Sequence, residues 1–334
     1  MKKSISQRDI ANALGVNAST VSRALKGLSG VSAELRQRIL EVAGESGYRP
    51  NPFAMSLRYG STRTIGIIVP DISFNHYAHI VKWIEAEARK NGYMCILTDS
   101  NDKYTNEVEC VEQLRNMHVE GIALCLSQET VDLDHLECLK GKNIPVVLFD
   151  RVADTEIPTV QFNDVESARQ ATLHLIDSGA RRIAFLGGPN RMKQTIDRKH
   201  GYLEALRERK MPICKELVKC GLASFNSGLS DTLELLSLPT PPDAILADHG
   251  LLSIACFQAI ISKGLRIPED VAVIGFMSDW VSGMSYPRMT FVKQNLREIG
   301  RKTFQLLLDQ INGTSNTKHI IVNSRLNVRE STLK

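Results

Sequence analysis

The N-terminal part of the chain contains the stretch Ser6-Gln-Arg-Asp-Ile-Ala-Asn-Ala-Leu-Gly-Val-Asn-Ala-Ser-Thr-Val-Ser-Arg-Ala-Leu25, which predicts two short helices joined by a tight turn. Ser6 is a residue type that caps helix N-termini, and Asp9, three residues later, lies near the positive end of the helix dipole. Gly15 ends the first helix, because glycine adopts a positive φ without a Cβ clash. Asn17 can then cap a second helix from Ala18 to Leu25.

The spacing within this stretch is typical of a helix-turn-helix. Ala11 is small enough for two helices to cross closely, Gly15 makes the turn, and Val21 fills the space between the helices. An ordinary pair of packed helices is the alternative. A third helix is predicted after Ser32, with Leu35, Ile39, Val42 and Ala43 recurring along one face.

The net charge of the chain is concentrated in its first 60 residues. This segment has nine Lys/Arg and four Asp/Glu, a net charge of +5, whereas the remainder has a net charge of −1. Such asymmetry suggests a basic module for a polyanion attached to a nearly neutral body. In a helix-turn-helix the second helix enters the major groove of DNA, so the residues expected to meet base edges are Ala18, Ser19, Ser22 and Arg23. Arg23 can make a bidentate contact to guanine, and a solvated surface arginine is its alternative.

The rest of the chain alternates strand-like and helical segments. The first series of apolar runs is Thr64–Val69, Met94–Leu97, Gly121–Leu126 and Pro145–Phe149, with an amphipathic helix expected over His76–Asn91. The second series is Ile183–Gly187, Ala244–Ala247 and Val271–Phe276, and a long helix near Leu296–Ile311 precedes two short strands, Ile320–Val322 and Leu326–Val328. This pattern predicts an α/β body of two subdomains, each a doubly wound parallel sheet.

Ligands of such sheets bind at the carboxyl ends of the strands, in a cleft between lobes. The candidate residues therefore follow the apolar runs, at Asp71–Phe74, Asp150-Arg151, Asn163-Asp164, Gly188–Arg198, Asp248-His249 and Met277–Trp280. Asp, Asn and Arg around an apolar wall suit a polyhydroxylated ligand such as a sugar, because carboxylates accept from paired hydroxyls and arginine donates back.

The stretch Asp9–Leu25 resembles the helix-turn-helix of the lactose/galactose repressor family. So do Val31-Ser-Ala-Glu-Leu-Arg36 and Gly47-Tyr-Arg-Pro-Asn-Pro52, and the similarity continues at intervals to Val328-Arg-Glu-Ser331. The resemblance implies a DNA-binding domain over 1–50, a hinge helix over 51–60, and an effector-binding and dimerisation body over 61–334. The body is expected to have a periplasmic-binding-protein-like fold of two α/β subdomains. The first covers about 61–160 plus a late crossing segment, and the second covers about 161–334.

The family also implies roles for single residues in DNA binding. Ala18, Ser19 and Arg23 match base-reading positions, and Ser6, Asn17 and Thr20 are placed to bind phosphate. Leu57 falls on the position that wedges into the minor groove at the operator centre and kinks the duplex. The alternative for Leu57 is packing on the body.

For the effector, Asp150, Arg198, Asp248 and Gln294 match positions where family members hold ligands. An inter-lobe salt bridge is the alternative for Arg198, and a strand-end cap is the alternative for the two aspartates. The chain departs from the family at Phe74, at His249 after Asp248, and at Met277, where polar groups are usual. These departures favour a larger, less polar or anionic sugar derivative, or a loss of binding. Trp280 is either a stacking platform or part of the core.

These observations predict a sequence-specific DNA-binding regulator, and they favour a repressor over an activator. The regulator is expected to bind a palindromic operator as a homodimer and to be controlled by a carbohydrate-derived effector. An activator, a tetramer and a ligand that tightens DNA binding all stay open. A solute-binding protein with no DNA role is the alternative.

A nucleotide-using enzyme is a weaker alternative, because Leu186-Gly-Gly-Pro-Asn190 lacks the phosphate-binding patterns. No catalytic residue, metal site or cofactor is expected. The absence of a run of about 18 apolar residues and of an export signal predicts a cytoplasmic protein with no membrane partner, and its seven cysteines are expected to be reduced thiols.

Overall fold

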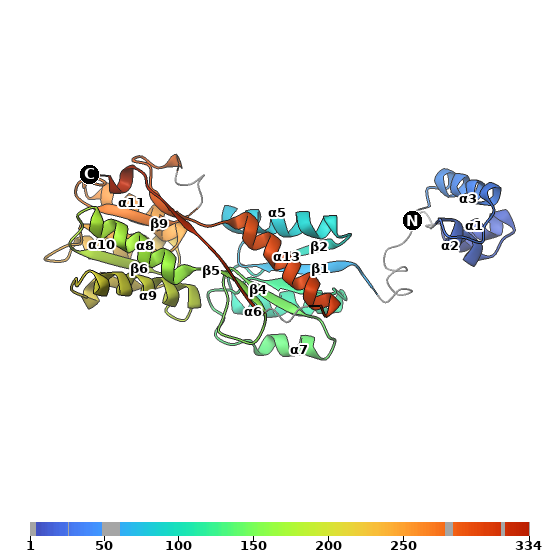
Figure 1. Cartoon of the computed structure of the whole chain (residues 1–334), viewed down its shortest axis with the longest axis horizontal. Helices are drawn as coiled ribbons and strands as arrows, with labels where there is room; N and C mark the ends of the chain where they lie inside the picture. The colour runs from blue at the N-terminus through green and yellow to red at the C-terminus, as the bar shows by residue number, and fades with distance from the viewer. Residues whose placement is uncertain (1–4, 26, 49–60, 278–282, 315–317, 334) are drawn as a thin grey trace. The chain divides into compact units, whose positions relative to one another are not determined.

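The computed structural model describes residues 5–25, 27–48, 61–277, 283–314 and 318–333. The chain divides into two compact units, a headpiece that precedes Arg63 and a body that begins there. Figure 1 labels the helices and strands of both units. None of the helices in the described ranges is long and apolar enough to cross a membrane.

The described part of the headpiece contains three short helices, α1 (Gln7–Leu14), α2 (Ala18–Leu25) and α3 (Ala33–Glu45). A capping box starts α1: the Ser6 hydroxyl accepts a hydrogen bond from the Asp9 N–H at 3.3 Å, and the Ser6 N–H donates to the Asp9 carboxylate at 2.8 Å. Gly15 ends α1 with a φ of 64°, and the Ser32 hydroxyl caps α3 by accepting from the Leu35 N–H. The predicted helix starts and stops agree with these elements.

The core of the headpiece is small, so each apolar side chain matters to its stability. Its buried members come from all three helices and are Ile10, Ala11, Val21, Ala24, Ile39 and Ala43. Val21 is fully buried, as expected of the residue that fills the crossing between α1 and α2.

The body contains two six-stranded sheets, and each belongs to one lobe. The sheet of the first lobe has the order β11-β5-β4-β3-β1-β2 and is parallel throughout. Its strands are β1 (Thr64–Val69), β2 (Met94–Asp99), β3 (Ile122–Leu124), β4 (Val146–Phe149), β5 (Thr159–Phe162) and β11 (His319–Val322). Its helices are α5 (Asn75–Lys90), α6 (Tyr104–Asn116), η1 (Asp134–Leu136), α7 (Glu137–Lys140) and α13 (Leu296–Asn312).

The sheet of the second lobe has the order β12-β10-β9-β8-β6-β7, with only the β10–β12 pair antiparallel. Its strands are β6 (Ile183–Gly187), β7 (Val218–Cys220), β8 (Ala244–Ala247), β9 (Ala272–Phe276), β10 (Thr290–Lys293) and β12 (Arg325–Asn327). Its helices are α8 (Asp164–Asp177), α9 (Lys193–Glu208), η2 (Lys215–Leu217), α10 (Phe225–Leu236), α11 (Gly250–Ser262) and η3 (Glu330–Thr332). Apolar clusters on both faces of each sheet confirm the predicted doubly wound α/β fold.

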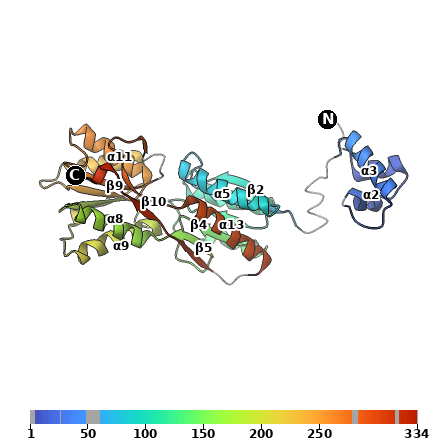
Figure 2. The same cartoon turned by 45° about the horizontal axis from the view of Figure 1, so that its top comes forward.

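The chain passes between the lobes three times, between β5 and α8, between β10 and α13, and between β11 and β12. Two of these crossings are tied together at Asn163, whose side-chain oxygen accepts from the Ser324 N–H at 2.9 Å and whose N–H donates to the Val322 carbonyl at 3.1 Å. The late helix α13 consequently packs against α5 of the first lobe, as Figures 1 and 2 show.

Three strands of the body were not expected from the sequence: β5, β7 and β10. They are only three or four residues long, which is too short to show a clear alternation of apolar and polar residues. The run predicted at Met94–Leu97 extends to Asp99, and the run predicted at Gly121–Leu126 forms a strand only over Ile122–Leu124.

The crossing of α8 and α9 depends on Gly201. A Cβ atom at this position would lie 2.0 Å from the Val165 carbonyl oxygen and 2.9 Å from the Arg169 nitrogen, so the helices would have to separate. We expect Gly201→Ala to lower the free energy of unfolding of the body by about 1–3 kcal/mol. The matched control is Gly141→Ala, where no atom lies within 4 Å and φ is −64°. Urea unfolding measures both, and equal stability of the two variants would contradict the expectation.

Candidate functional site

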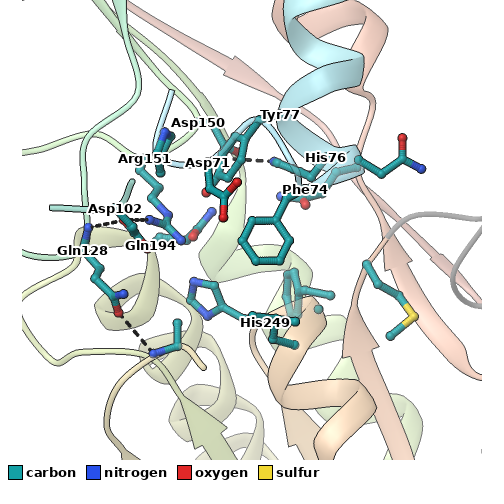
Figure 3. Close-up of a pocket in the computed structure, with 18 of the residues that line it drawn as sticks. Asp71, Phe74, His76, Tyr77, Asp102, Gln128, Asp150, Arg151, Gln194 and His249 are labelled. Atoms are coloured by element: carbon teal, nitrogen blue, oxygen red, sulfur yellow. Dashed lines mark hydrogen bonds and ion pairs between the residues drawn. The ribbon is translucent and has the colours of Figure 1, made fainter. Parts of the chain in front are cut away.

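A cavity of about 360 Å³ lies between the two lobes of the body. The side chains around it follow the carboxyl ends of β1, β2, β3, β4, β7, β8, β9 and β10 or lie near the starts of the adjoining helices, where ligands of parallel sheets bind. Figure 3 shows these side chains converging on one space. They include Asp71, Phe74, His76, Tyr77, Asp102, Gln128, Asp150, Arg151, Gln194, Arg198, His249, Leu251, Ile254, Phe276, Met277 and Gln294.

Asp150 supplies a buried carboxylate from the first lobe. It follows β4 in the left-handed region with a φ of 59°, a conformation that aspartate tolerates better than most residues. Burial alone would raise the pKa of Asp150, but His76 at 3.1 Å and the nearby guanidinium groups hold the pKa below its ordinary value. One carboxylate oxygen faces His76, and the other, Oδ1, has no hydrogen-bond partner in the described part of the chain.

A chain of hydrogen bonds joins the first lobe to the second at one side of the cavity. The Arg151 guanidinium donates to Asp102 at 2.7 Å, and the same carboxylate oxygen accepts from the Gln128 N–H at 2.8 Å. The Gln128 side-chain oxygen then accepts from the Ala223 N–H at 3.2 Å, and its carbonyl accepts from Arg191 at 2.8 Å. A change in the angle between the lobes would have to alter these bonds (Figure 3).

Arg198 anchors the second lobe behind the cavity. Its side chain is only 2% exposed, its Nε donates to Asp164 at 2.8 Å, and its Nη1 donates to the Asp248 carbonyl. The guanidinium carbon lies 3.9 Å from the centre of the Phe276 ring. Burial raises the pKa of Asp164 to about 6, although the charge of Arg198 acts to lower it. The Nη2 group of Arg198 has no partner within the described residues.

Asp248 and His249 form a pair at the start of α11. The Asp248 carboxylate accepts from the Gly188 N–H at 3.1 Å and contacts His249 Nδ1 at 2.5 Å. Burial acts to raise the pKa of Asp248, but His249 and Arg198 lower it below its ordinary value. Since the ionised carboxylate is an acceptor, His249 donates to it from Nδ1, and its second ring nitrogen, Nε2, makes no contact with this carboxylate. This Nε2 is buried and has no partner in the described ranges.

Five of the seven residues predicted to hold an effector lie on the cavity: Phe74, Asp150, Arg198, Met277 and Gln294. Asp248 does not line it, because its carboxylate is used inside the second lobe to position Gly188 and His249. Trp280 lies outside the described residues.

The sequence analysis did not single out His76, Tyr77, Asp102 or Gln128. Asp102 and Gln128 follow strand-like runs closely, so the strand-end rule could have found them. His76 and Tyr77 lie in the first turn of α5 and carry no such signal.

The headpiece presents a polar surface along α2. Asn17, Ser19 and Arg23 are exposed, while Ala18 and Thr20 are half-buried. Ser22 is only 5% exposed, because it lies beside Val21 on the face of α2 that packs against the other helices, and its contact with a base edge stays a prediction. Ser6 is exposed, but its hydroxyl already takes part in the capping box of α1. Leu57 lies outside the described residues.

The chain is similar along nearly its whole length to known bacterial regulators. It is 30% identical to the HTH-type transcriptional repressor CytR of Escherichia coli (strain K12) over 321 residues, which cover 96% of this chain and 92% of that protein. Residues 7–51 match the bacterial regulatory proteins, lacI family. This chain belongs to the lacI family.

Further comparisons support the same membership. Residues 172–332 match a periplasmic binding protein-like domain. Catabolite control protein A of Priestia megaterium is 31% identical over 97% of this chain and 98% of its own length. The solved complex of the transcriptional regulator CelR with cellobiose superposes with a TM-score of 0.74 at 29% identity, covering 98% of this chain and 99% of that one. The resemblance inferred from the helix-turn-helix is thus confirmed, and as a lacI-family member the chain is a DNA-binding transcriptional regulator.

The contact between His76 and Asp150 makes the stability of the body depend on pH. Because the pKa of Asp150 is lowered in the folded state, its carboxylate contributes stability above the unfolded-state pKa of about 4, and this contribution is lost as the pH falls through the folded-state pKa. We expect His76→Gln to raise the pKa of Asp150 and to lower the free energy of unfolding by about 1–3 kcal/mol at pH 7, with a smaller loss once the pH falls below about 4, through the folded-state pKa of Asp150.

Urea unfolding over this pH range measures the effect. The matched control is His200→Gln, which removes an exposed histidine that faces Glu204 on α9. A loss in His76→Gln that stays the same from pH 7 down to about pH 2 would show that the histidine acts through packing alone.

Proposed function

We propose that the chain is a repressor whose binding to a palindromic operator is controlled by a sugar or sugar derivative held in the inter-lobe cavity. The observation that carries this proposal is the combination, in one lacI-family chain, of an exposed arginine on α2 with a cavity lined by unpartnered buried polar atoms. Relatives named as repressors and a relative solved with cellobiose support it. Because residues 7–51 match a family of regulators, we set aside a solute-binding protein without a DNA role.

The proposal includes a homodimer that acts in the cytoplasm and catalyses no reaction. A two-fold protein matches a palindromic operator, because each headpiece then meets an equivalent half-site. The strand β2 lies at the edge of its sheet, where Met94 is 57% exposed and Leu97 is also exposed. An exposed apolar edge of this kind favours contact with another protein surface, here a second copy of the chain.

The effector would act by favouring one arrangement of the lobes. A ligand that contacts Asp150 of the first lobe and His249 of the second prefers whichever arrangement satisfies both groups. Its influence on DNA binding is limited by its difference in affinity for the two arrangements. We propose that the segment 51–60 transmits the change to the operator.

Arg23 tests the DNA-binding role. We expect Arg23→Ala to reduce the preference for the selected operator over random duplex by about 1–3 kcal/mol, because a bidentate contact to guanine is lost. The matched control is Arg38→Ala, which removes the same charge from an exposed position on α3. Arg38→Ala should weaken specific and random binding alike. The operator is first selected from random duplexes, and competition titrations at fixed salt then measure specific and random binding of both variants. An unchanged preference for the operator in Arg23→Ala would reject the role of Arg23 in reading a base.

Asp150 tests the effector site. We expect Asp150→Asn to bind operator normally but to require about tenfold or more of any sugar that releases the wild-type protein, because a charge-assisted hydrogen bond is worth about 1.5–3 kcal/mol. The matched control is Asp177→Asn, an exposed carboxylate paired with Arg209 on the surface. Operator release across a panel of pentoses, hexoses and disaccharides gives the readout. A wild-type sugar response retained in full by Asp150→Asn would place the effector elsewhere.

A further inference from the structure

The charges and apolar side chains of the inter-lobe cavity restrict the class of ligand beyond a sugar or sugar derivative. We propose that the cavity selects a neutral glycoside that carries a flat apolar group, and that it rejects phosphorylated and carboxylated sugars. This inference rests on the proposed effector role of the same cavity. It is carried by the balance of charges, the four unpartnered polar atoms and the position of Phe74.

The charge balance opposes an anionic ligand. Five carboxylates line the cavity or lie directly behind its wall: Asp71, Asp102, Asp150, Asp164 and Asp248. Among the described residues only two guanidinium groups line it, and each already contacts a carboxylate, Arg151 with Asp102 and Arg198 with Asp164. No lysine is among the described residues that line the cavity. A phosphate or carboxylate would therefore lose its hydration in a site whose guanidinium groups are already paired with carboxylates, and this desolvation costs free energy.

The two histidines do not change this balance. His76 contacts the Asp150 carboxylate at 3.1 Å, and His249 contacts the Asp248 carboxylate at 2.5 Å. If either ring carries a positive charge, the carboxylate of the aspartate beside it already balances that charge. Both pairs thus contribute at most a balanced charge, and the Asp71 carboxylate at the rim adds a negative one.

The four unpartnered atoms fit neutral hydroxyl groups. Asp150 Oδ1 can accept hydrogen bonds, Arg198 Nη2 and Gln294 Nε2 can donate them, and His249 Nε2 adds an unpartnered ring nitrogen. A hydroxyl group both donates and accepts, so adjacent hydroxyls on one ring can satisfy acceptors and donors together. The four atoms come from both lobes and from the crossing after β10, so a ligand that bonds to all of them would contact all three regions. Buried polar atoms of this kind are normally paired, which explains why a ligand would be favoured here.

Phe74 supplies a surface for a flat apolar group. It occupies the N-cap position of α5, where a polar side chain would normally bond to the first turn, and it makes no such bond. Its ring is 36% exposed and points into the space that His249 faces from the second lobe, as Figure 3 shows. Leu251, Ile254 and Met277 extend this apolar wall. An aromatic group would gain from contact with this ring, whereas an unsubstituted sugar would leave it exposed.

The experiment compares matched ligands on the full-length protein by isothermal titration calorimetry. For each of a set of pentoses and hexoses, the probes are the methyl glycoside, the phenyl glycoside, the sugar phosphate and the uronate. Nucleosides are added as ligands in which a flat group is linked to the sugar through nitrogen. We expect a core whose phenyl glycoside or nucleoside binds about three- to tenfold more tightly than its methyl glycoside. We also expect phosphates and uronates of that core to bind at least about tenfold more weakly than the methyl glycoside.

Variants of Phe74 test the apolar part separately. Phe74→Ala should abolish the preference for the aromatic glycoside, so that phenyl and methyl glycosides bind equally well, and Phe74→Leu should keep an intermediate preference. Tyr286→Ala is the matched control, because it removes an aromatic ring that is 92% exposed and does not line the cavity. Thermal unfolding of each variant verifies that the body is folded.

Three results would overturn the inference: tighter binding of a phosphate or uronate than of every neutral glycoside, equal binding of phenyl and methyl glycosides, or no binding of any neutral glycoside. Operator binding by the same preparations is measured in parallel without ligand. If operator binding is intact while the ligand preference is anionic, only the ligand class is wrong. If no duplex is bound selectively, the proposed repressor function fails independently of the ligand result.

Discussion

The buried guanidinium of Arg198 is the interaction on which the geometry of the cavity depends. It joins Asp164 at the start of α8 to the Asp248 carbonyl at the end of β8, and it covers the Phe276 ring at the end of β9. Three elements of the second lobe are therefore held at one point. A buried charge is tolerated only when it is paired and hydrogen-bonded, so this arrangement leaves little freedom for the wall that faces the first lobe.

The cavity also depends on the topology of the body. In both sheets the parallel strands end at the same edge, so loops that follow most of these strands reach one space although their residues are spread between positions 70 and 294. The three crossings join the two lobes. The contacts of Gln128 with Ala223 and Arg191 join the lobes near the cavity, so a ligand that changed the angle between the lobes would have to alter these contacts.

The departures from the family at Phe74, His249 and Met277 have a common consequence in the structure. All three side chains lie on the cavity, where they supply an aromatic ring, an imidazole held by Asp248 and a thioether. The result is a site that is polar where Asp150 and Arg198 lie and apolar where Phe74 and Ile254 lie. Such a division matches a ligand with two chemically different ends.

The sequence by itself determined the headpiece, because its signals are local: a capping serine, a turn glycine and apolar residues at helical spacing act within a few residues of one another. It also determined the alternation of strands and helices, and through the strand-end rule it indicated Asp150, Arg198 and Met277 at the ligand site. Only the tertiary structure decided that Asp248 acts behind the wall, that His76 pairs with Asp150, that Ser22 is buried, and that the short strands β5, β7 and β10 exist. These features depend on partners far away in the chain or on the packing of neighbouring helices, and no local pattern of residue types specifies them.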